Sequence, residues 1–248
     1  MTALEAVSVY LPPTRVPIET LAGPLGLTDM QVKLFRRFHG LREVGRDPGA
    51  SLQDLLLRAA AGLDALRGQE HRVRYVLYAR TMPVIGPYPV NPLHEVCRAL
   101  GLGHALAFTV THQSCASGLL AIDMAGRLLA ADTADGQDGA GPLALVLAGE
   151  KAFTREAQVF ADTTIFGEGA SACLVSAFGA RDRMLAYASN VRGEFDSATG
   201  GNDARLQREY RPSLAEVMRP AFRSRAATCS DRHSGWQKHR SWGSADWG

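Results

Sequence analysis

The pattern of apolar and polar positions along this chain predicts alternating strands and helices. Residues that are apolar throughout, or at every second position, predict strands. These strands are residues 5–12, 72–80, 105–112, 142–152, 170–178 and 184–193. Apolar residues with a helical spacing predict helices at residues 27–40, 51–68, 92–103, 115–131 and 203–222. The order β-α-β-α-β-α-β-β predicts an α/β fold in which a mostly parallel sheet is covered by helices.

The clearest predicted helix is 51–68. Ser51 and Asp54 have the spacing of a capping pair at its start. One face of this helix carries leucines that we expect to be buried, namely Leu52, Leu55, Leu56, Leu63 and Leu66. The strands 142–152 and 170–178 are almost entirely apolar, which is typical of strands covered on both faces.

Cys115 lies in "THQSCASGLLAIDMAGRLL", between a predicted strand and a predicted helix. Unpaired N–H groups and the dipole at a helix start favour an anion, so a thiolate is favoured there. The small residues Ala116, Ser117 and Gly118 leave room for a substrate carbonyl. Cys115 is therefore a candidate nucleophile, and the alternative is a small buried hydrophobic residue. His112 lies three residues before Cys115, so a Cys–His dyad is an alternative, but a strand end and a following helix start can point such side chains apart.

The segment "FGEGASACLV" (166–175) fits the pattern G-x-G-x-x-A of a dinucleotide loop. That loop should open a helix, whereas this segment leads into a predicted strand. We therefore expect a tight turn at which the backbone closely approaches another element. A separate cluster of arginines (Arg36, Arg37, Arg42 and Arg46) is either a solvated face or a surface that attracts an anionic carrier or phosphate.

Composition excludes several classes of protein. The net charge is +2, with both signs spread along the chain, which argues against a dedicated nucleic-acid or membrane-surface protein. There is no apolar run of the ~20 residues that a membrane helix needs, and no signal-peptide pattern. The four cysteines form no CxxC pair and have no metal-ligand spacing. We expect a cytoplasmic protein with no metal and no nucleic-acid or membrane partner.

Residues 223–248 differ from the rest of the chain. They contain no Leu, Ile, Val or Met, but hold all three tryptophans and five Lys/Arg against two Asp/Glu. Such a segment has no apolar stripe for a helix or strand, so it is predicted to be disordered or aberrant. A shifted reading frame is one hypothesis for its origin.

Two central motifs together resemble the ketoacyl-acyl carrier protein synthase III family. "SCASGLLAIDMA" is similar to its nucleophile segment, and "TTIFGEGASACLV" to its Gly-Asp-Gly-Ala stretch, with Glu168 in place of Asp. The resemblance covers roughly residues 4–180. It implies the thiolase-like fold, which has two βαβαβαββ halves, each with a five-stranded sheet between helices. Residues 1–200 then form the nucleophile half, residues 201–222 begin a second half, and the tail is irregular.

The resemblance also implies an activity. The Cys115 thiolate would attack a thioester of coenzyme A or acyl carrier protein and form an acyl-enzyme, as in fatty-acid or polyketide-type biosynthesis. Gly167, Glu168 and Gly169 would form a turn that supports the site. No bound cofactor is implied, and the expected partners are the carrier or coenzyme A thioester and a second copy or an intact homologue.

Some of the family's residues have no match in this chain. A His and an Asn from the second half complete the family's site, but the only histidines after Cys115 are His233 and His239, in unrelated contexts. Leu34 and Phe38 stand where the family has a Trp and an Arg near the coenzyme A adenine. The alternative is therefore a catalytically incomplete truncated product or an accessory subunit that binds a carrier protein. A hydrolase is disfavoured because "HQSCASG" lacks the glycines of G-x-S-x-G.

Overall fold

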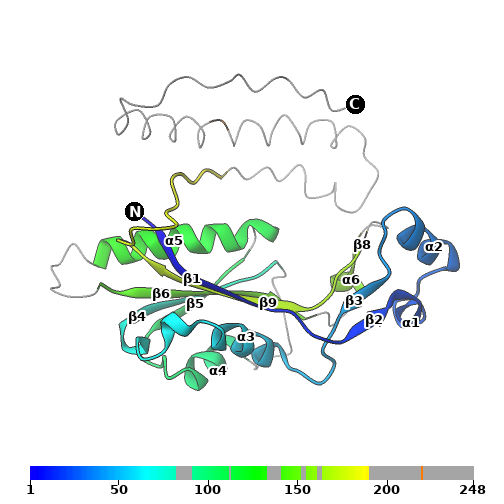
Figure 1. Cartoon of the computed structure of the whole chain (residues 1–248), viewed down its shortest axis with the longest axis horizontal. Helices are drawn as coiled ribbons and strands as arrows, with labels where there is room; N and C mark the ends of the chain where they lie inside the picture. The colour runs from blue at the N-terminus through cyan, green and yellow to red at the C-terminus, as the bar shows by residue number, and fades with distance from the viewer. Residues whose placement is uncertain are drawn as a thin grey trace. The chain divides into compact units, whose positions relative to one another are not determined.

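The computed structural model describes residues 1–81, 91–111, 113–132, 141–151, 155–160, 164–189 and 219. The described residues fall into two units, with residues 1–184 in the first and residues 185–189 and 219 in the second. The first unit carries the elements labelled in Figure 1. Apart from residue 219, the predicted helix 203–222, the predicted boundaries at 200 and 222, and the tail lie outside the described residues.

The first unit is built on a five-stranded sheet of order β1-β9-β6-β4-β5 (Figure 1). Its strands are β1 (Ala3–Tyr10), β4 (Val73–Ala79), β5 (Leu106–Val110), β6 (Leu143–Glu150) and β9 (Gly169–Ser176). β4 pairs in parallel with β5 and β6, whereas β9 is antiparallel to both β6 and β1. The sheet is therefore mixed: four strands run one way, as predicted, but β9 runs against its two neighbours.

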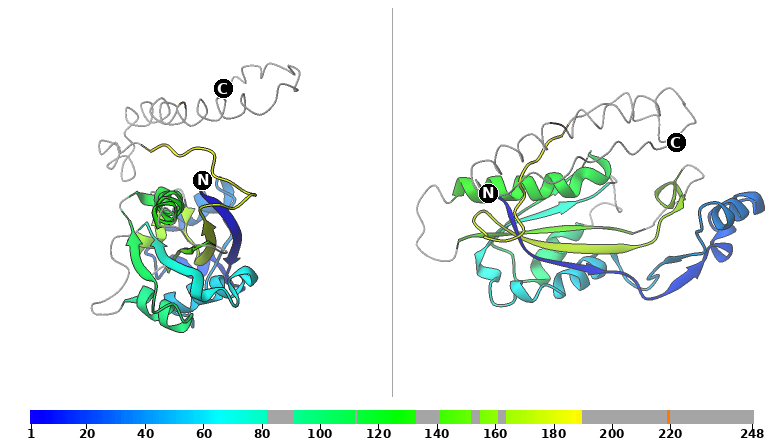
Figure 2. Two further views of the ribbon diagram at one scale, coloured as in Figure 1. Left: turned by 90° about the vertical axis from the view of Figure 1, so that its left-hand side faces the viewer. Right: turned by 45° about the horizontal axis from the view of Figure 1, so that its top comes forward.

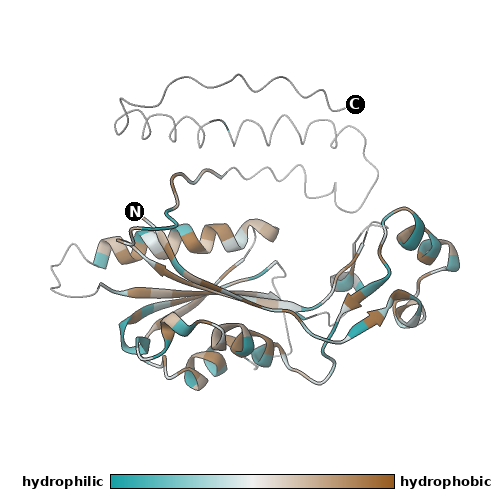
Figure 3. Cartoon of the chain, viewed as in Figure 1, coloured by the Kyte–Doolittle hydropathy of each residue, from teal (hydrophilic) through white to brown (hydrophobic). Residues whose placement is uncertain are grey.

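Helices cover both faces of this sheet, so the predicted layers are confirmed. α3 (Leu52–Ala61) and α4 (Pro92–Ala99) pack on one face, and α5 (Ser117–Asp132) packs on the other (Figure 2). The strands between them are strongly apolar (Figure 3), and the central ones are almost completely buried. On one face, Leu55 and Leu56 of α3 pack with Val76 and Leu145 of the sheet. On the other face, Ala121, Ala125 and Leu129 of α5 pack with Leu77.

The predicted capping pair and buried face of the 51–68 helix are confirmed. The Asp54 N–H donates to Ser51 Oγ over 3.1 Å, and the Ser51 N–H donates to the Asp54 carboxylate over 2.7 Å. All five predicted leucines are at most 4% exposed. The helix is shorter than predicted, because α3 ends at Ala61 and a separate 3-10 turn covers Asp64–Leu66.

The predicted strand at 184–193 is wrong over residues 184–189, which form no strand. On the edge of β1 that faces away from β9, the described residues form one isolated bridge, between Ala3 and Arg183. A register shift between Leu4 and Ala6 interrupts β1 immediately afterwards. A bulge of this kind disrupts the regular edge that a further strand would follow.

Several short elements have no counterpart in the predicted pattern. β2 (Arg15–Pro17), α1 (Ile18–Ala22), α2 (Asp29–Arg37) and β3 (Glu43–Gly45) form a small module over residues 15–45, called here the α1–α2 module, of which only α2 was predicted. This module has its own core, made of Ile18, Leu21, Leu25, Phe35 and Val44 together with Ile165. Ile165 belongs to the two-residue strand β8 (Thr164–Ile165), which pairs with β7 (Val159–Phe160) after the short helix α6 (Arg155–Gln158). Strands of two or three residues are too short to show a period.

One buried carboxylate joins the α1–α2 module to the sheet. The Glu168 side chain is fully buried and accepts hydrogen bonds from the Asp47 N–H over 2.8 Å and from Lys151 Nζ over 3.1 Å. Lys151 Nζ also donates to the Asp47 carbonyl over 2.7 Å. Arg46 Nε lies 3.6 Å from the same carboxylate. Since Asp47 follows β3 while Lys151 and Glu168 flank β6 and β9, this cluster fixes the module at one end of the sheet.

Asp47 extends this cluster to β1 and α3. Its carboxylate accepts hydrogen bonds from Arg58 and from the Tyr10 hydroxyl. Arg58 also donates to the Tyr10 hydroxyl over 2.6 Å and lies over the Tyr10 ring. The hydrogen bond from Arg58 holds the pKa of Asp47 below its ordinary value.

A glycine allows α5 to pack against the first strand. A Cβ at Gly126 would lie 1.8 Å from Thr2 Oγ1 and 2.6 Å from Thr2 Cβ. Thr2 cannot withdraw freely, because its carbonyl accepts a hydrogen bond from the Met184 N–H over 2.9 Å. The position of α5 on the sheet therefore requires glycine at 126.

We predict that Gly126→Ala destabilises the chain by about 1–3 kcal/mol, because the added methyl group overpacks this contact. Gly118→Ala is the matched control on the same helix, since a Cβ there has nothing within 4 Å. Alanine is the better helix former, so the control should be neutral or slightly stabilising. Urea denaturation of both variants measures the difference, and equal stability of the two would contradict the packing described.

We also predict that Glu168→Gln destabilises the chain by about 2–4 kcal/mol, because it leaves two partly buried cations without their carboxylate. Asp64→Asn is the control, since it removes an ion pair with Arg67 whose side chains are 84% and 72% exposed. Exposed pairs contribute little, so that variant should unfold like the wild type. Thermal unfolding followed by circular dichroism makes the comparison, and an unaltered melting temperature for Glu168→Gln would rule out the anchoring role.

Candidate functional site

Cys115 lies in a single 3-10 turn (Ser114–Ala116) that connects β5 to α5. The residue is exposed, and the Ala116 N–H beside it donates to the Gln113 carbonyl over 3.0 Å. α5 begins at Ser117, two residues later than predicted, and continues for 16 residues. The first N–H groups of such a helix have no partner within it, so they attract negative charge at its start.

The carboxyl ends of β4, β5 and β6 meet at the edge of the sheet where Cys115 lies. The Arg80 N–H, just past β4, donates to the Val110 carbonyl at the end of β5 over 3.1 Å. The next N–H, of Thr81, donates to the Glu150 carboxylate at the end of β6. In α/β sheets, ligands bind beyond the carboxyl ends of parallel strands, so this edge is the candidate site.

Buried polar atoms without a hydrogen-bond partner also gather at this edge. Among the described residues, they include Arg80 Nε, Thr111 Oγ1 and Ser117 Oγ. Thr111 follows β5 and Ser117 opens α5, so both flank Cys115 in the chain. An unpaired buried polar group is costly, and such groups are available to hydrogen-bond a ligand. Ser117 was singled out from the sequence for its small size and not as a hydrogen-bonding group. Arg80 and Thr111 were not predicted, although their positions at strand ends were a usable signal.

The other described cysteines occupy a different environment. Cys97 in α4 and Cys173 in β9 are both buried. Burial raises the pKa of the Cys97 thiol, and it raises the pKa of Cys173 to about 11. At neutral pH both are thus held as unreactive thiols. Cys229 lies outside the described residues.

A tight turn was predicted at Gly167–Gly169, but these residues form no turn: the segment leads from β8 into β9 and contacts the α1–α2 module there. A Cβ at Gly167 would lie 2.9 Å from the Gly45 carbonyl oxygen, and the Glu168 N–H donates to that same oxygen over 2.8 Å. The predicted close backbone approach is therefore confirmed. The Glu168 side chain accepts hydrogen bonds from the Asp47 N–H and from Lys151, so within the described residues this segment holds the module.

In the predicted arginine cluster, two side chains lie beside carboxylates and two are exposed without a described ion pair. Arg36 forms an ion pair with Glu19 over 2.6 Å, and Arg46 lies beside Glu168. Arg37 and Arg42 are exposed. His112 lies outside the described residues, so its orientation relative to Cys115 stays a prediction.

Two further kinds of feature are lacking within the described part of the chain. No three His, Cys, Asp or Glu side chains are placed to hold a metal ion there. None of the helices in that part has the length and apolar character needed to cross a membrane.

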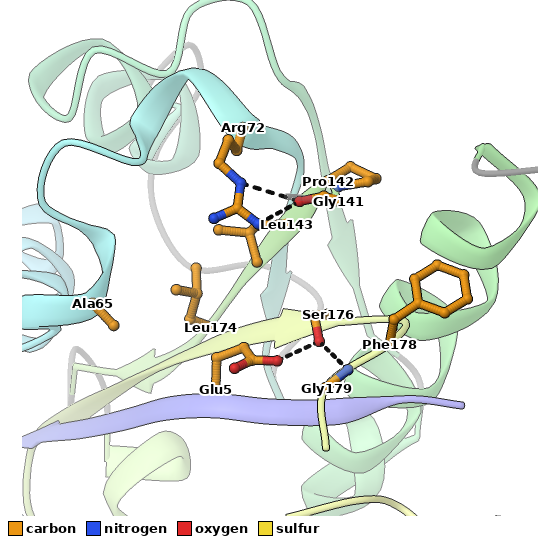
Figure 4. A pocket seen from close by; sticks show the side chains of 10 residues that line it. All are labelled: Glu5, Ala65, Arg72, Gly141, Pro142, Leu143, Leu174, Ser176, Phe178 and Gly179. Carbon is orange, nitrogen blue, oxygen red and sulfur yellow. Dashed lines mark hydrogen bonds between the residues drawn. The ribbon is translucent and has the colours of Figure 1, made fainter. Parts of the chain in front are cut away.

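A hollow of about 290 Å³ lies at the opposite end of the sheet from Cys115 (Figure 4). Its polar groups are already used: Arg72 donates to the Gly141 carbonyl over 2.6 and 3.1 Å, and Ser176 donates to Glu5. The remaining wall is largely apolar, with Leu143 and Leu174. Since these groups hold one another, we do not assign a ligand to this hollow.

Comparison with known proteins shows similarity in structure. No protein-family model and no curated protein sequence matches the chain. ChlB3, described as an acyltransferase, is 20% identical, with a TM-score of 0.62 over 82% of this chain and 59% of its own. The 3-oxoacyl-(acyl carrier protein) synthase III (FabH) of Pseudomonas aeruginosa PAO1 is 24% identical, with a TM-score of 0.57 over 79% of this chain and 58% of its own.

The HMG synthase of the curacin biosynthetic pathway is also similar, at 24% identity and a TM-score of 0.51, over 71% of this chain and 40% of its own. That synthase has also been solved in complex with its donor-ACP. The chain thus spans between 40% and 59% of the length of these three proteins. At this level of identity the likeness establishes the fold, and it confirms the resemblance predicted from the motifs: the chain has the α/β fold of 3-oxoacyl-(acyl carrier protein) synthase III and other thiolase-like enzymes.

Proposed function

We propose that this chain is an acyltransferase-type protein in which the Cys115 thiol accepts an acyl group from a thioester. The thioester would be carried by an acyl carrier protein or by coenzyme A. The proteins of similar fold are named as synthases and an acyltransferase, which supports this class of chemistry. The complex of the curacin HMG synthase with its donor-ACP supports a carrier protein as the partner.

The observation that carries the proposal is the placement of Cys115. Of the cysteines that the structure describes, Cys115 is the one that is exposed, and it lies at the start of a 16-residue helix. It also lies at the carboxyl edge of the parallel strands, beside the unpaired hydroxyls of Thr111 and Ser117. A nucleophile needs this combination of access, nearby N–H groups and hydrogen-bond donors.

The proposed reaction has two steps, attack on the thioester carbonyl and loss of the donor thiol. The Cys115 sulfur attacks the thioester carbonyl carbon, and negative charge develops on the carbonyl oxygen. The N–H groups at the start of α5 would stabilise this oxygen. The bond between the carbonyl carbon and the donor sulfur then breaks, the donor leaves as a thiol with the proton lost by Cys115, and the acyl group stays on Cys115.

We limit the proposal to this half-reaction. Condensation in the family that the motifs resemble uses a His and an Asn, and neither matches in this chain. Self-acylation is therefore expected to be slow, and decarboxylative formation of a carbon–carbon bond is not expected from the chain alone. The second candidate is a non-catalytic accessory subunit, which the missing His and Asn favour.

We predict that incubation with an acetyl thioester of N-acetylcysteamine adds one acetyl group to the intact chain. The adduct should map to the peptide that contains Cys115 and be lost in Cys115→Ala, because no other described thiol is exposed. Mass spectrometry of the intact and digested protein measures this.

The control is Cys97→Ala, which removes a buried thiol and should leave the adduct in place. An equal adduct in Cys115→Ala would refute Cys115 as the acyl acceptor. Absence of an adduct with every acyl donor would instead favour the accessory subunit.

A second prediction tests reactivity without a substrate. At pH 8, iodoacetamide should alkylate Cys115 at least about tenfold faster than Cys97 or Cys173, because these two thiols are buried and their pKa values are raised. Peptide mapping reads each cysteine, Cys229 included, separately. In denaturant the differences should disappear, whereas rapid native labelling of Cys173 would contradict the burial described.

A further inference from the structure

Arg80 carries a positive charge at the carboxyl end of β4 that no described residue neutralises at close range. The residue is partly buried, its Nε is fully buried, and that Nε has no hydrogen-bond partner. Arg80 takes part in none of the ion pairs between described residues. A buried guanidinium costs free energy unless an anion or other acceptors compensate it. Arg80 is therefore a candidate to bind an anionic group of a ligand.

Thr111, on the neighbouring strand, places a second unpaired polar group beside Arg80. Ala79 and Val110 are partners in the parallel pairing of β4 with β5. The Arg80 N–H continues this pairing, because it donates to the Val110 carbonyl over 3.1 Å. Arg80 and Thr111 are thus the next residues along the two strands, and Thr111 Oγ1 is also buried without a partner. A guanidinium next to a hydroxyl supplies the hydrogen-bond donors that suit a carboxylate.

The carboxylate of Glu150 lies at the same edge, but it forms no ion pair with Arg80 in the part of the chain that the structure describes. It accepts a hydrogen bond from the Thr81 N–H. Burial raises the pKa of the Tyr78 hydroxyl, the Glu150 charge raises it further, and the Arg80 charge lowers it. Both charges therefore act at the end of β4, and Glu150 still leaves the Arg80 Nε–H without an acceptor.

Cys115 lies four residues after Thr111, at this edge of the sheet. The turn Ser114–Ala116 carries it, and Ser117, which follows, is 1% exposed with an unpaired hydroxyl. An acyl chain on Cys115 starts at this edge, so a polar group at its far end can reach the donors of Arg80 and Thr111. The phosphate of a donor is instead at the outer end of its pantetheine arm, away from the buried Nε.

We propose that Arg80 and Thr111 bind a carboxylate at the far end of the acyl group, so that the chain takes half-thioesters of dicarboxylic acids. This inference rests on the proposed function and names the class of acyl group that Cys115 accepts. The carboxylate stays ionised and takes no part in the bond changes. The Cys115 sulfur still bonds to the thioester carbonyl carbon, and the donor still leaves as a thiol. A neutral acyl chain would leave the buried guanidinium without an anion.

The test compares two acyl donors of the same shape that differ in charge. Succinyl-N-acetylcysteamine ends in a carboxylate, whereas 4-oxopentanoyl-N-acetylcysteamine has a methyl group in place of the charged oxygen. Neither donor has a phosphate, so an effect of Arg80 on their ratio comes from the acyl group. Mass spectrometry of the peptide that contains Cys115 gives the rate constant of acylation, and Cys115→Ala gives the background.

Three variants separate charge from fold, and circular dichroism confirms that each of them folds. Arg80→Met removes the charge but keeps an unbranched side chain, and Arg80→Lys keeps the charge without the planar fork. Arg98→Met is the matched control, because it removes the same charge at an exposed position of α4.

The wild type should acylate at least about tenfold faster with the succinyl donor than with the neutral donor, because a buried polar site rejects a ligand that leaves it unpaired. Arg80→Met should lower this ratio to about one, Arg80→Lys should keep part of it, and Arg98→Met should keep all of it. The same ratio in the wild type and in Arg80→Met would overturn the carboxylate site.

Thermal unfolding separates failure of this inference from failure of the proposed function. At a saturating concentration, succinate should raise the melting temperature of the wild type by about 2 °C or more, and should not raise that of Arg80→Met. If neither donor acylates Cys115, the proposed function fails. In that case a shift that is lost in Arg80→Met would still support the carboxylate site, and the absence of a shift would overturn it.

Discussion

The end of the sheet that carries the candidate site depends on one buried interaction, the carboxylate of Glu168 with Lys151 and the Asp47 N–H. Removing a carboxylate from such a position leaves the partly buried cations of Lys151 and Arg46 uncompensated, which is more costly than breaking an exposed pair. The same cluster holds Arg46 and, through Asp47, reaches Arg58 and α3. Without it, the α1–α2 module would be held by its apolar contacts and by a few hydrogen bonds to main-chain carbonyls, such as those of the Glu168 N–H to Gly45 and of Arg155 to Leu25.

The chemistry at this end follows from how the strands and helices are arranged. Three parallel strands end at one edge, and the connection from β5 to α5 delivers Cys115 there as an exposed residue. Gly126 lets α5 lie close enough to β1 to cover the sheet. Other apolar groups of the same strand and helix, including Val9 and Leu119, are about 60% exposed, so the cover is incomplete. The exposed Cys115 and these exposed apolar side chains therefore belong to the same side of the sheet, the side that α5 covers.

Much of this fold could be predicted from the sequence, because the long elements carry a clear period. The five sheet strands and four of the helices were located this way, and the buried leucines of α3 follow from their spacing alone. The α1–α2 module was mostly missed, since strands such as Arg15–Pro17 are too short for any period and depend on tertiary contacts. Cys115 was found from its place between a strand and a helix. Arg80 and Thr111 were not found, and Ser117 was noted only for its small size, because a missing hydrogen-bond partner shows only once the fold is assembled.

The function proposed for this chain requires that Cys115 take up an acyl group at the start of α5. A crystal structure of the chain after incubation with an acyl thioester would reveal both the acceptor atom and the position of the carbonyl oxygen. We predict density for an acyl group on Cys115 Sγ, with its carbonyl oxygen directed at the first N–H groups of α5. An acyl group on another residue, or a Cys115 adduct whose oxygen points away from the helix, would contradict this assignment.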